Sequence, residues 1–172
     1  MASQLRPIVN QRLYFARLHC DWIAQEQDKQ QLPKRVIEQS LGESVIFHLV
    51  MAYRAYLSEV GEAYLQPQRA YSSALELLQF FSEQKVESAQ VSELALLEGR
   101  SEPDGWLRDL LALHMQSVNS AHTLPAVAVN SRNTLAITLT DQADELSLER
   151  GLHFHHCLSV LIETQRLCLE EW

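Results

Sequence analysis

Apolar residues recur at steps of three and four along the first third of the chain. One set is Leu5, Val9, Leu13, Ala16, Cys20 and Ile23, and a second is Val45, Ile46, Leu49, Ala52, Tyr53, Tyr56, Leu57 and Val60. This spacing places each set on one face of a helix. The polar run 25–31 and Pro33 separate the two sets, and Pro is favoured in the first turn of a helix. The pattern predicts a helical hairpin, with helices over about 4–30 and 33–64.

The helical period continues in later segments. A third helix is expected to open at Pro67, and a short helical piece covers 91–98. Beyond Ser101 the expected apolar face consists of Trp106, Leu107, Leu110, Leu111, Met115 and Val118. The last helix is expected to start near Ser147, a residue type favoured at N-caps. Its expected buried face is Phe154, Leu158, Leu161, Cys168, Leu169 and Trp172.

Residues 123–140 break this pattern, because apolar residues there alternate with small or polar ones at a period of two. We expect either a β-hairpin or an extended loop lying over the helices. The fold prediction is therefore an all-α, antiparallel bundle of four to five helices with a short extended or β-hairpin-like excursion near 123–140. We expect residues 1–172 to form one domain, since this length can bury a continuous core.

Composition and charge narrow the classes of function. With 47% hydrophobic and 21% charged residues the chain has the composition of a globular protein. A net charge of −8 with scattered basic residues disfavours binding to nucleic acid or anionic lipid. The three cysteines lie within helical patterns, which is typical of reduced thiols. No hydrophobic signal segment or membrane-spanning stretch is present, so we expect a cytoplasmic protein.

A polar stripe on the first predicted helix is a candidate binding feature. Arg12, His19 and Glu26 are seven residues apart and form one line between two apolar sets, and His114 has similar apolar neighbours. Charged groups in such positions are either paired in the interior or mark a groove. We expect Arg12 to meet a carboxylate, inside the bundle or at a dimer seam. The candidates are Glu43, Glu59 and Glu163.

The histidine-rich segment near the chain's end suggests a metal site as one alternative. His153, His155 and His156 spread over roughly 160° of a helix, so they cannot share one ion from a single helix. Only Glu149, His153 and Cys157, at steps of four, line up on one face. We expect no bound metal and no other cofactor, with this trio as the alternative ligand set.

A second alternative comes from Arg150 and His155, an R-x4-H pair near the start of the last helix. The pair resembles the catalytic motif of HEPN-type ribonucleases, which are small helical dimers. That resemblance implies metal-independent RNA cleavage, with His155 in proton transfer and Arg150 stabilising phosphate charge. Gly151 departs from the pattern, because the family usually has a polar residue after the arginine.

The segments 11–18 (QRLYFARL) and 47–57 (FHLVMAYRAYL) resemble an uncharacterised family of short bacterial helical proteins. The resemblance covers the first hairpin and implies a bacterial cytosolic origin, without an activity. The preferred hypothesis is a non-enzymatic adaptor or regulatory protein. Its partner would be another protein or a second copy of the chain, as a homodimer.

Overall fold

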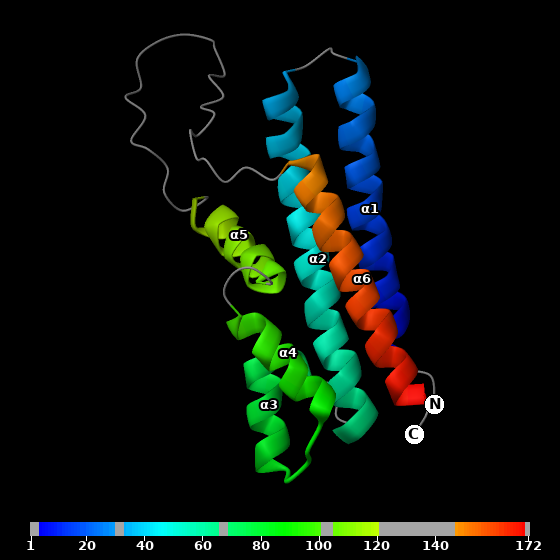
Figure 1. Cartoon of the computed structure of the whole chain (residues 1–172), viewed down its shortest axis with the longest axis vertical. Coiled ribbons are helices and arrows are strands. Elements are labelled where there is room, and N and C mark those ends of the chain that lie inside the picture. Colours follow the sequence, from blue (N-terminus) through cyan, green and yellow to red (C-terminus); the bar gives the residue numbers. More distant parts are fainter. Residues whose placement is uncertain (1–3, 30–32, 66–68, 101–104, 121–146, 171–172) are drawn as a thin grey trace.

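The structure, a computed structural model, describes residues 4–29, 33–65, 69–100, 105–120 and 147–170. Within this part of the chain there are six helices and no strand (Figure 1). They are α1 (Arg6–Lys29), α2 (Lys34–Leu65), α3 (Ala74–Glu83), α4 (Ala89–Gly99), α5 (Trp106–Ser120) and α6 (Leu148–Glu170). The all-α prediction is confirmed. The number of helices exceeds the expected four to five, and the excursion expected near 123–140 lies outside the described residues.

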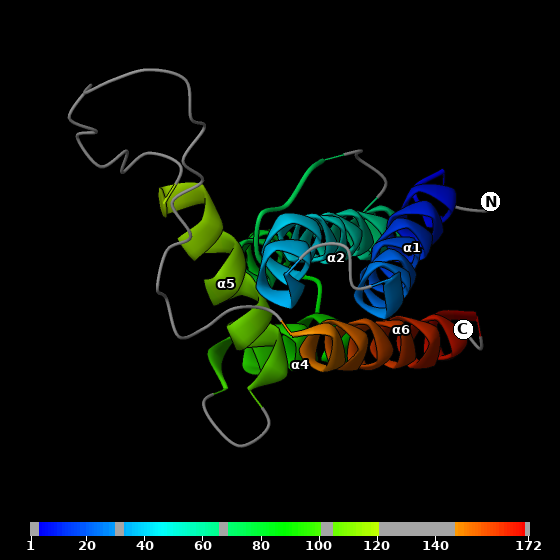
Figure 2. The same cartoon turned by 90° about the horizontal axis from the view of Figure 1, so that it is seen from above.

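The antiparallel hairpin α1–α2 forms the centre of the molecule together with α6. In Figures 1 and 2, α6 lies along one side of the hairpin and contacts both of its helices. It runs antiparallel to α1. The other three helices lie beyond α2, and on the side of the hairpin away from α6 the described part of the segment leading into α3 passes across α2 (Figure 2). Among the described residues, the two sides of the hairpin therefore have different surroundings.

Helix α2 supplies the largest part of the core, and its two buried tyrosine hydroxyls find partners on other helices. Tyr53 and Tyr56 are fully buried, and their hydroxyls donate to Glu98 on α4 (2.8 Å) and to Gln165 on α6 (2.9 Å). Glu98 also accepts from the backbone N–H of Ala74 (2.8 Å). This one carboxylate therefore links α2, α3 and α4. It also gives the buried Tyr53 hydroxyl a partner, without which the hydroxyl would destabilise the fold.

Side-chain caps define where the later helices begin. Ser73 and Ser88 accept hydrogen bonds from backbone N–H groups in the first turns of α3 and α4. Ser147 does the same for α6, accepting from the N–H of Arg150 at 3.2 Å, as the sequence predicted. The third helix starts at Ala74 and not at Pro67, because its cap is Ser73.

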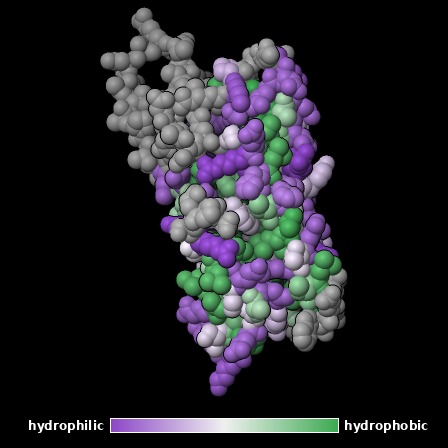
Figure 3. All heavy atoms as spheres, in the orientation of Figure 1, coloured by the Kyte–Doolittle hydropathy of each residue, from purple (hydrophilic) through white to green (hydrophobic). Residues whose placement is uncertain are grey.

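Two predicted apolar faces are wrong in their second halves. On α5, Met115 and Val118 are exposed, while Leu113 and His114 are buried. On α6 the expected Cys168 is exposed, and the buried positions are taken by other residues, including two polar ones. On the side that α6 presents, hydrophobic residues form separate areas interrupted by hydrophilic ones (Figure 3). No helix within the described ranges is both long and apolar enough to cross a membrane.

Candidate functional site

Arg12 lies half-buried at the edge of the seam between α1 and α2. Its Nη1 donates to Nδ1 of His48 at 3.3 Å, and its guanidinium lies 5.9 Å from the ring centre of Phe47. The carboxylate expected beside Arg12 is absent among the described residues. Glu59, one of the three candidates, pairs with Arg166 instead. A carboxylate partner at a dimer seam, the other arrangement expected for Arg12, stays a prediction.

Around Arg12, aromatic rings from both helices of the hairpin contact one another. The ring of His48 lies 5.4 Å from Phe15, 5.2 Å from His19 and 5.4 Å from Phe47, measured between centroids. The ring of His19 packs edge-on against Trp22 at 5.1 Å, and its Nδ1 donates to the carbonyl of Phe15 at 2.7 Å. These spacings lie in the range of favourable aromatic pairs. The cluster holds its side chains in defined positions.

Several apolar side chains of this cluster are exposed. Ile8, Trp22 and Phe47 each have 44% of their surface exposed. A groove of about 600 Å³ continues this surface toward the segment before α3 and is lined by Ile8, Arg12, Met51 and Arg54, among others. We use the name outer hairpin face for Ile8, Arg12, Phe15, His19, Trp22, Phe47, His48 and Met51. None of these eight residues lines the groove between α1 and α6.

The outer hairpin face is electrostatically simple. Burial lowers the pKa of His48 below its usual 6.5, and the nearby His19 and Arg12 add to the effect. His48 therefore accepts from Arg12 as a neutral ring near pH 7. The fixed charge of the face itself is the guanidinium of Arg12, and the adjoining groove adds Arg54 and the carboxylate of Glu76.

The two remaining members of the predicted stripe have other surroundings. Glu26 is on the same line of α1 and forms an ion pair with Lys29, one turn further on. His114 lies on α5 and is 9% exposed, and burial is the main cause that lowers its pKa. It packs away from α1, so the structure brings together Arg12 and His19 but not His114.

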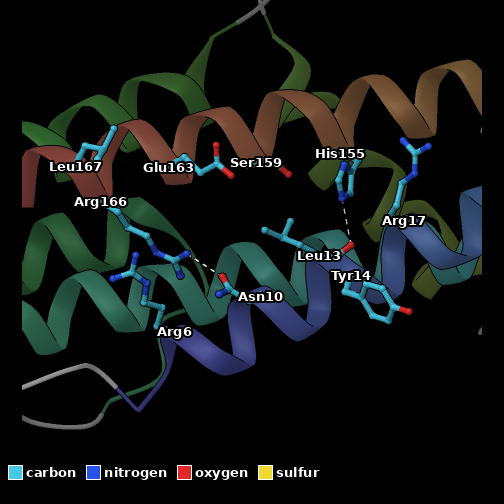
Figure 4. A pocket seen from close by; sticks show the side chains of 10 residues that line it. All are labelled: Arg6, Asn10, Leu13, Tyr14, Arg17, His155, Ser159, Glu163, Arg166 and Leu167. Atoms are coloured by element: carbon cyan, nitrogen blue, oxygen red, sulfur yellow. Dashed lines mark hydrogen bonds between the residues drawn. The ribbon is translucent and has the colours of Figure 1, made fainter.

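A second hollow, a groove of about 640 Å³, lies between α1 and α6 (Figure 4). Its lining residues are Arg6, Asn10, Leu13, Tyr14, Arg17, His155, Ser159, Glu163, Arg166 and Leu167. Sequence reasoning missed most of this set, because its members are scattered over two helices at opposite ends of the chain. The only indication of this groove in the sequence was that α1 and α6 each have a polar side.

Arg166 lines this groove and is held by two partners, Glu59 and Asn10. Its Nε and Nη2 donate to the two carboxylate oxygens of Glu59 at 2.9 and 2.6 Å, and Nη1 donates to Asn10 at 2.8 Å. Arg17 at the rim pairs with Asp21. Two of the three arginines that line the groove, Arg17 and Arg166, thus have carboxylate partners, and Glu163 adds a negative charge to the wall.

Arg150 and His155, the residues of the ribonuclease alternative, contact different helices. Arg150 pairs with Asp109 on α5 at 3.5 Å, whereas Nε2 of His155 donates to the carbonyl of Leu13 on α1 at 3.2 Å. Burial is the main cause that lowers the pKa of His155 below 6.5. The two side chains therefore do not share a site within one chain.

The alternative metal ligands line up along α6 without forming a closed group. His153 and Cys157 are in contact, with Sγ 3.7 Å from Nε2, and burial raises the pKa of the Cys157 thiol. Glu149 lies exposed in the first turn. Across the described ranges, no three His, Cys, Asp or Glu side chains are grouped so that they could hold a metal ion.

The comparisons with known proteins place the chain in a family. A family model described as "Family of unknown function (DUF6586)" matches residues 1–172. The chain belongs to this family. The match covers its whole length, whereas the resemblance seen in the sequence covered only the first hairpin. No curated protein and no solved structure matches this member of DUF6586.

Sequence reasoning found half of the outer hairpin face in this DUF6586 chain. It identified the line of Arg12 and His19 but not the contribution of α2. The missed signal was Phe47 and Met51 at a step of four, beside His48. The apolar face predicted for this helix, with Leu49 and Tyr53 among its members, left Phe47 and Met51 out.

Proposed function

We propose that this protein works by binding another protein at the outer hairpin face, as a non-enzymatic, single-domain adaptor or regulator in the cytoplasm. The observation that carries the proposal is the group of exposed, mutually packed aromatic and aliphatic side chains around Arg12. Aromatic residues and arginine are the types most enriched where binding energy concentrates in protein interfaces.

The side chains of the cluster are held in place before any partner binds, which strengthens the proposal. Rings that already contact one another lose little conformational freedom on binding, so less of the interaction energy is lost to ordering. The guanidinium of Arg12 is half-buried and stacked beside Phe47, which leaves donors for an incoming carboxylate or carbonyl. An apolar surface of this kind marks an interaction site more often than an isolated exposed side chain does.

The two alternatives have less support from the geometry. A ribonuclease would need Arg150 and His155 in one site, and a metal protein would need at least three converging ligands. Neither arrangement occurs among the described residues.

Site-specific photo-crosslinking in the native cell tests the proposal. A photoreactive phenylalanine analogue at Phe47 or Trp22 should form a covalent adduct with a protein, resolved by mass on a gel. The matched controls are Leu75 on α3 and Leu96 on α4, which are 66% and 68% exposed but lie outside the face. Adduct formation at Phe47 and Trp22 no greater than at the two controls would refute the proposal.

A further inference from the structure

The outer hairpin face, together with Glu26, which continues its line along α1, has a spacing that suits one occupant in particular. On α1 the residues Ile8, Arg12, Phe15, His19, Trp22 and Glu26 follow one another at steps of four and three. This is the spacing of the contact seam between two helices in a coiled coil. A parallel seam on the same helix, with Val9, Ala16, Cys20 and Ile23, is buried inside the chain. Helix α1 therefore carries two seams, and only one is covered among the described residues.

The charges on the uncovered seam are arranged symmetrically. Arg12 and Glu26 each lie seven residues from His19, so they are about 21 Å apart along the helix axis. They cannot pair with each other within one helix. If a second α1 ran antiparallel across the first, with His19 near the crossing point, Arg12 of each copy would face Glu26 of the other. In the same register, Phe15 of one copy would lie within one residue of the position facing Trp22 of the other.

Building on the proposed function, we propose that the partner is a second copy of this chain, docked antiparallel through the outer hairpin face. A two-fold axis perpendicular to the helices places α1 on α1 and generates the Arg12–Glu26 pair twice. The parallel arrangement would place like charges opposite each other. The symmetric placement of Arg12 and Glu26 about His19 thus favours the antiparallel orientation.

The size of the face is sufficient for such a contact. Helix α1 has 24 residues, so it is about 36 Å long, and two packed helices are roughly 20 Å wide. The whole side of the hairpin therefore projects roughly 700 Å² per copy, part of which the segment before α3 covers, and this is comparable with the ~800 Å² that each partner buries in a standard interface. In the dimer, Glu26 gives up its ion pair with Lys29 and pairs with Arg12 of the second copy. The pair with Lys29 is exposed and contributes little, whereas the new pair is shielded from water.

A charge-exchange experiment tests the inference. The mass in solution, measured by light scattering over a range of concentrations, should approach two chains for the wild type. Arg12→Glu and Glu26→Arg should each weaken dimerisation by about tenfold or more, because each places like charges together twice. The double variant should regain most of the affinity. Arg17→Glu and Asp21→Arg, an exposed pair on another side of α1, are the matched controls and should leave dimerisation unchanged.

Several results would overturn the inference. They are a wild type that stays monomeric at every concentration, single variants with wild-type affinity, or a double variant that is no better than the singles. Glu26→Arg alone is decisive if Arg12→Glu fails to fold, because Glu26 is partly exposed. A monomeric wild type that still gives adducts with a different protein at Phe47 or Trp22 would refute self-docking and leave the proposed function standing.

Discussion

At the scale of single residues, Glu59 and Arg166 form a buried ion pair between α2 and α6. Their side chains are 8% and 9% exposed, and each carboxylate oxygen accepts from a different guanidinium nitrogen. A buried charge is tolerated only when it is paired and hydrogen-bonded. Hydropathy patterns treat both residues as surface residues. The pairing could not be predicted from the sequence, since the two partners are 107 positions apart.

Removing one member of this pair should cost far more than removing an exposed one. Glu59→Leu should lower the free energy of unfolding by about 3–5 kcal/mol, because the guanidinium of Arg166 stays buried without its counter-charge. Asp21→Leu, which removes the exposed partner of Arg17, should cost less than about 1 kcal/mol. Urea unfolding measures both. Equal losses in the two variants would show that Glu59 and Arg166 are solvated.

His155 should make the stability depend on pH. Burial holds its pKa below 6.5 in the folded chain, although the Leu13 carbonyl and Asp21 act in the opposite direction; Arg17 and His156 lower it further. Between the folded and unfolded pKa values the unfolded chain binds more protons, so stability falls as the pH drops below about 6.5. His155→Gln should show a shallower decline in urea unfolding between pH 7 and 5 than His153→Gln, its exposed neighbour on α6. Identical slopes would contradict this assignment.

At the scale of elements, the helices themselves were largely predictable. Periodicity located α1 and α2, and Ser147 marked the start of α6, because capping and spacing are local properties of the chain. Burial was less predictable. On α6, Gln165 and Arg166 occupy buried positions since Tyr56 and Glu59 on α2 offer them partners. Polar residues with buried partners are invisible to a hydropathy pattern, so Cys168 was wrongly placed inside.

The contact of α2 with the segment before α3 depends on the small size of Gly61. A β-carbon there would lie 2.8 Å from Cε2 of Tyr71, whereas Gly99 at the end of α4 has open space. Gly61→Ala should therefore lower the free energy of unfolding by about 1–2 kcal/mol, since overpacking outweighs the better helix propensity of alanine. Gly99→Ala should be neutral or slightly stabilising. Thermal unfolding compares the two, and a Gly61→Ala variant as stable as wild type would mean that Tyr71 moves aside freely.

At the scale of the whole molecule, an all-α fold followed from the sequence but the joining of helices did not. The contact of Arg12 with His48 spans 36 residues, so it depends on the register in which α1 and α2 pair. Hydrophobic periodicity predicts which side of each helix is buried, but it does not predict how far one helix is shifted along the other. The outer hairpin face, which is made by both helices, could therefore be only half predicted from the stripe on α1.

The position of α6 also has a consequence for biosynthesis. While the ribosome is still making the later helices, the hairpin has already emerged. Glu59 stays without its partner Arg166 until that residue is translated, 107 codons downstream. At about 5–20 residues per second that wait lasts roughly 5–20 s. During it, the side of α1 and α2 that α6 will cover stays open to water. We expect a nascent chain in this state, with both sides of its hairpin exposed, to bind chaperones at the ribosomal exit more readily than the finished chain does.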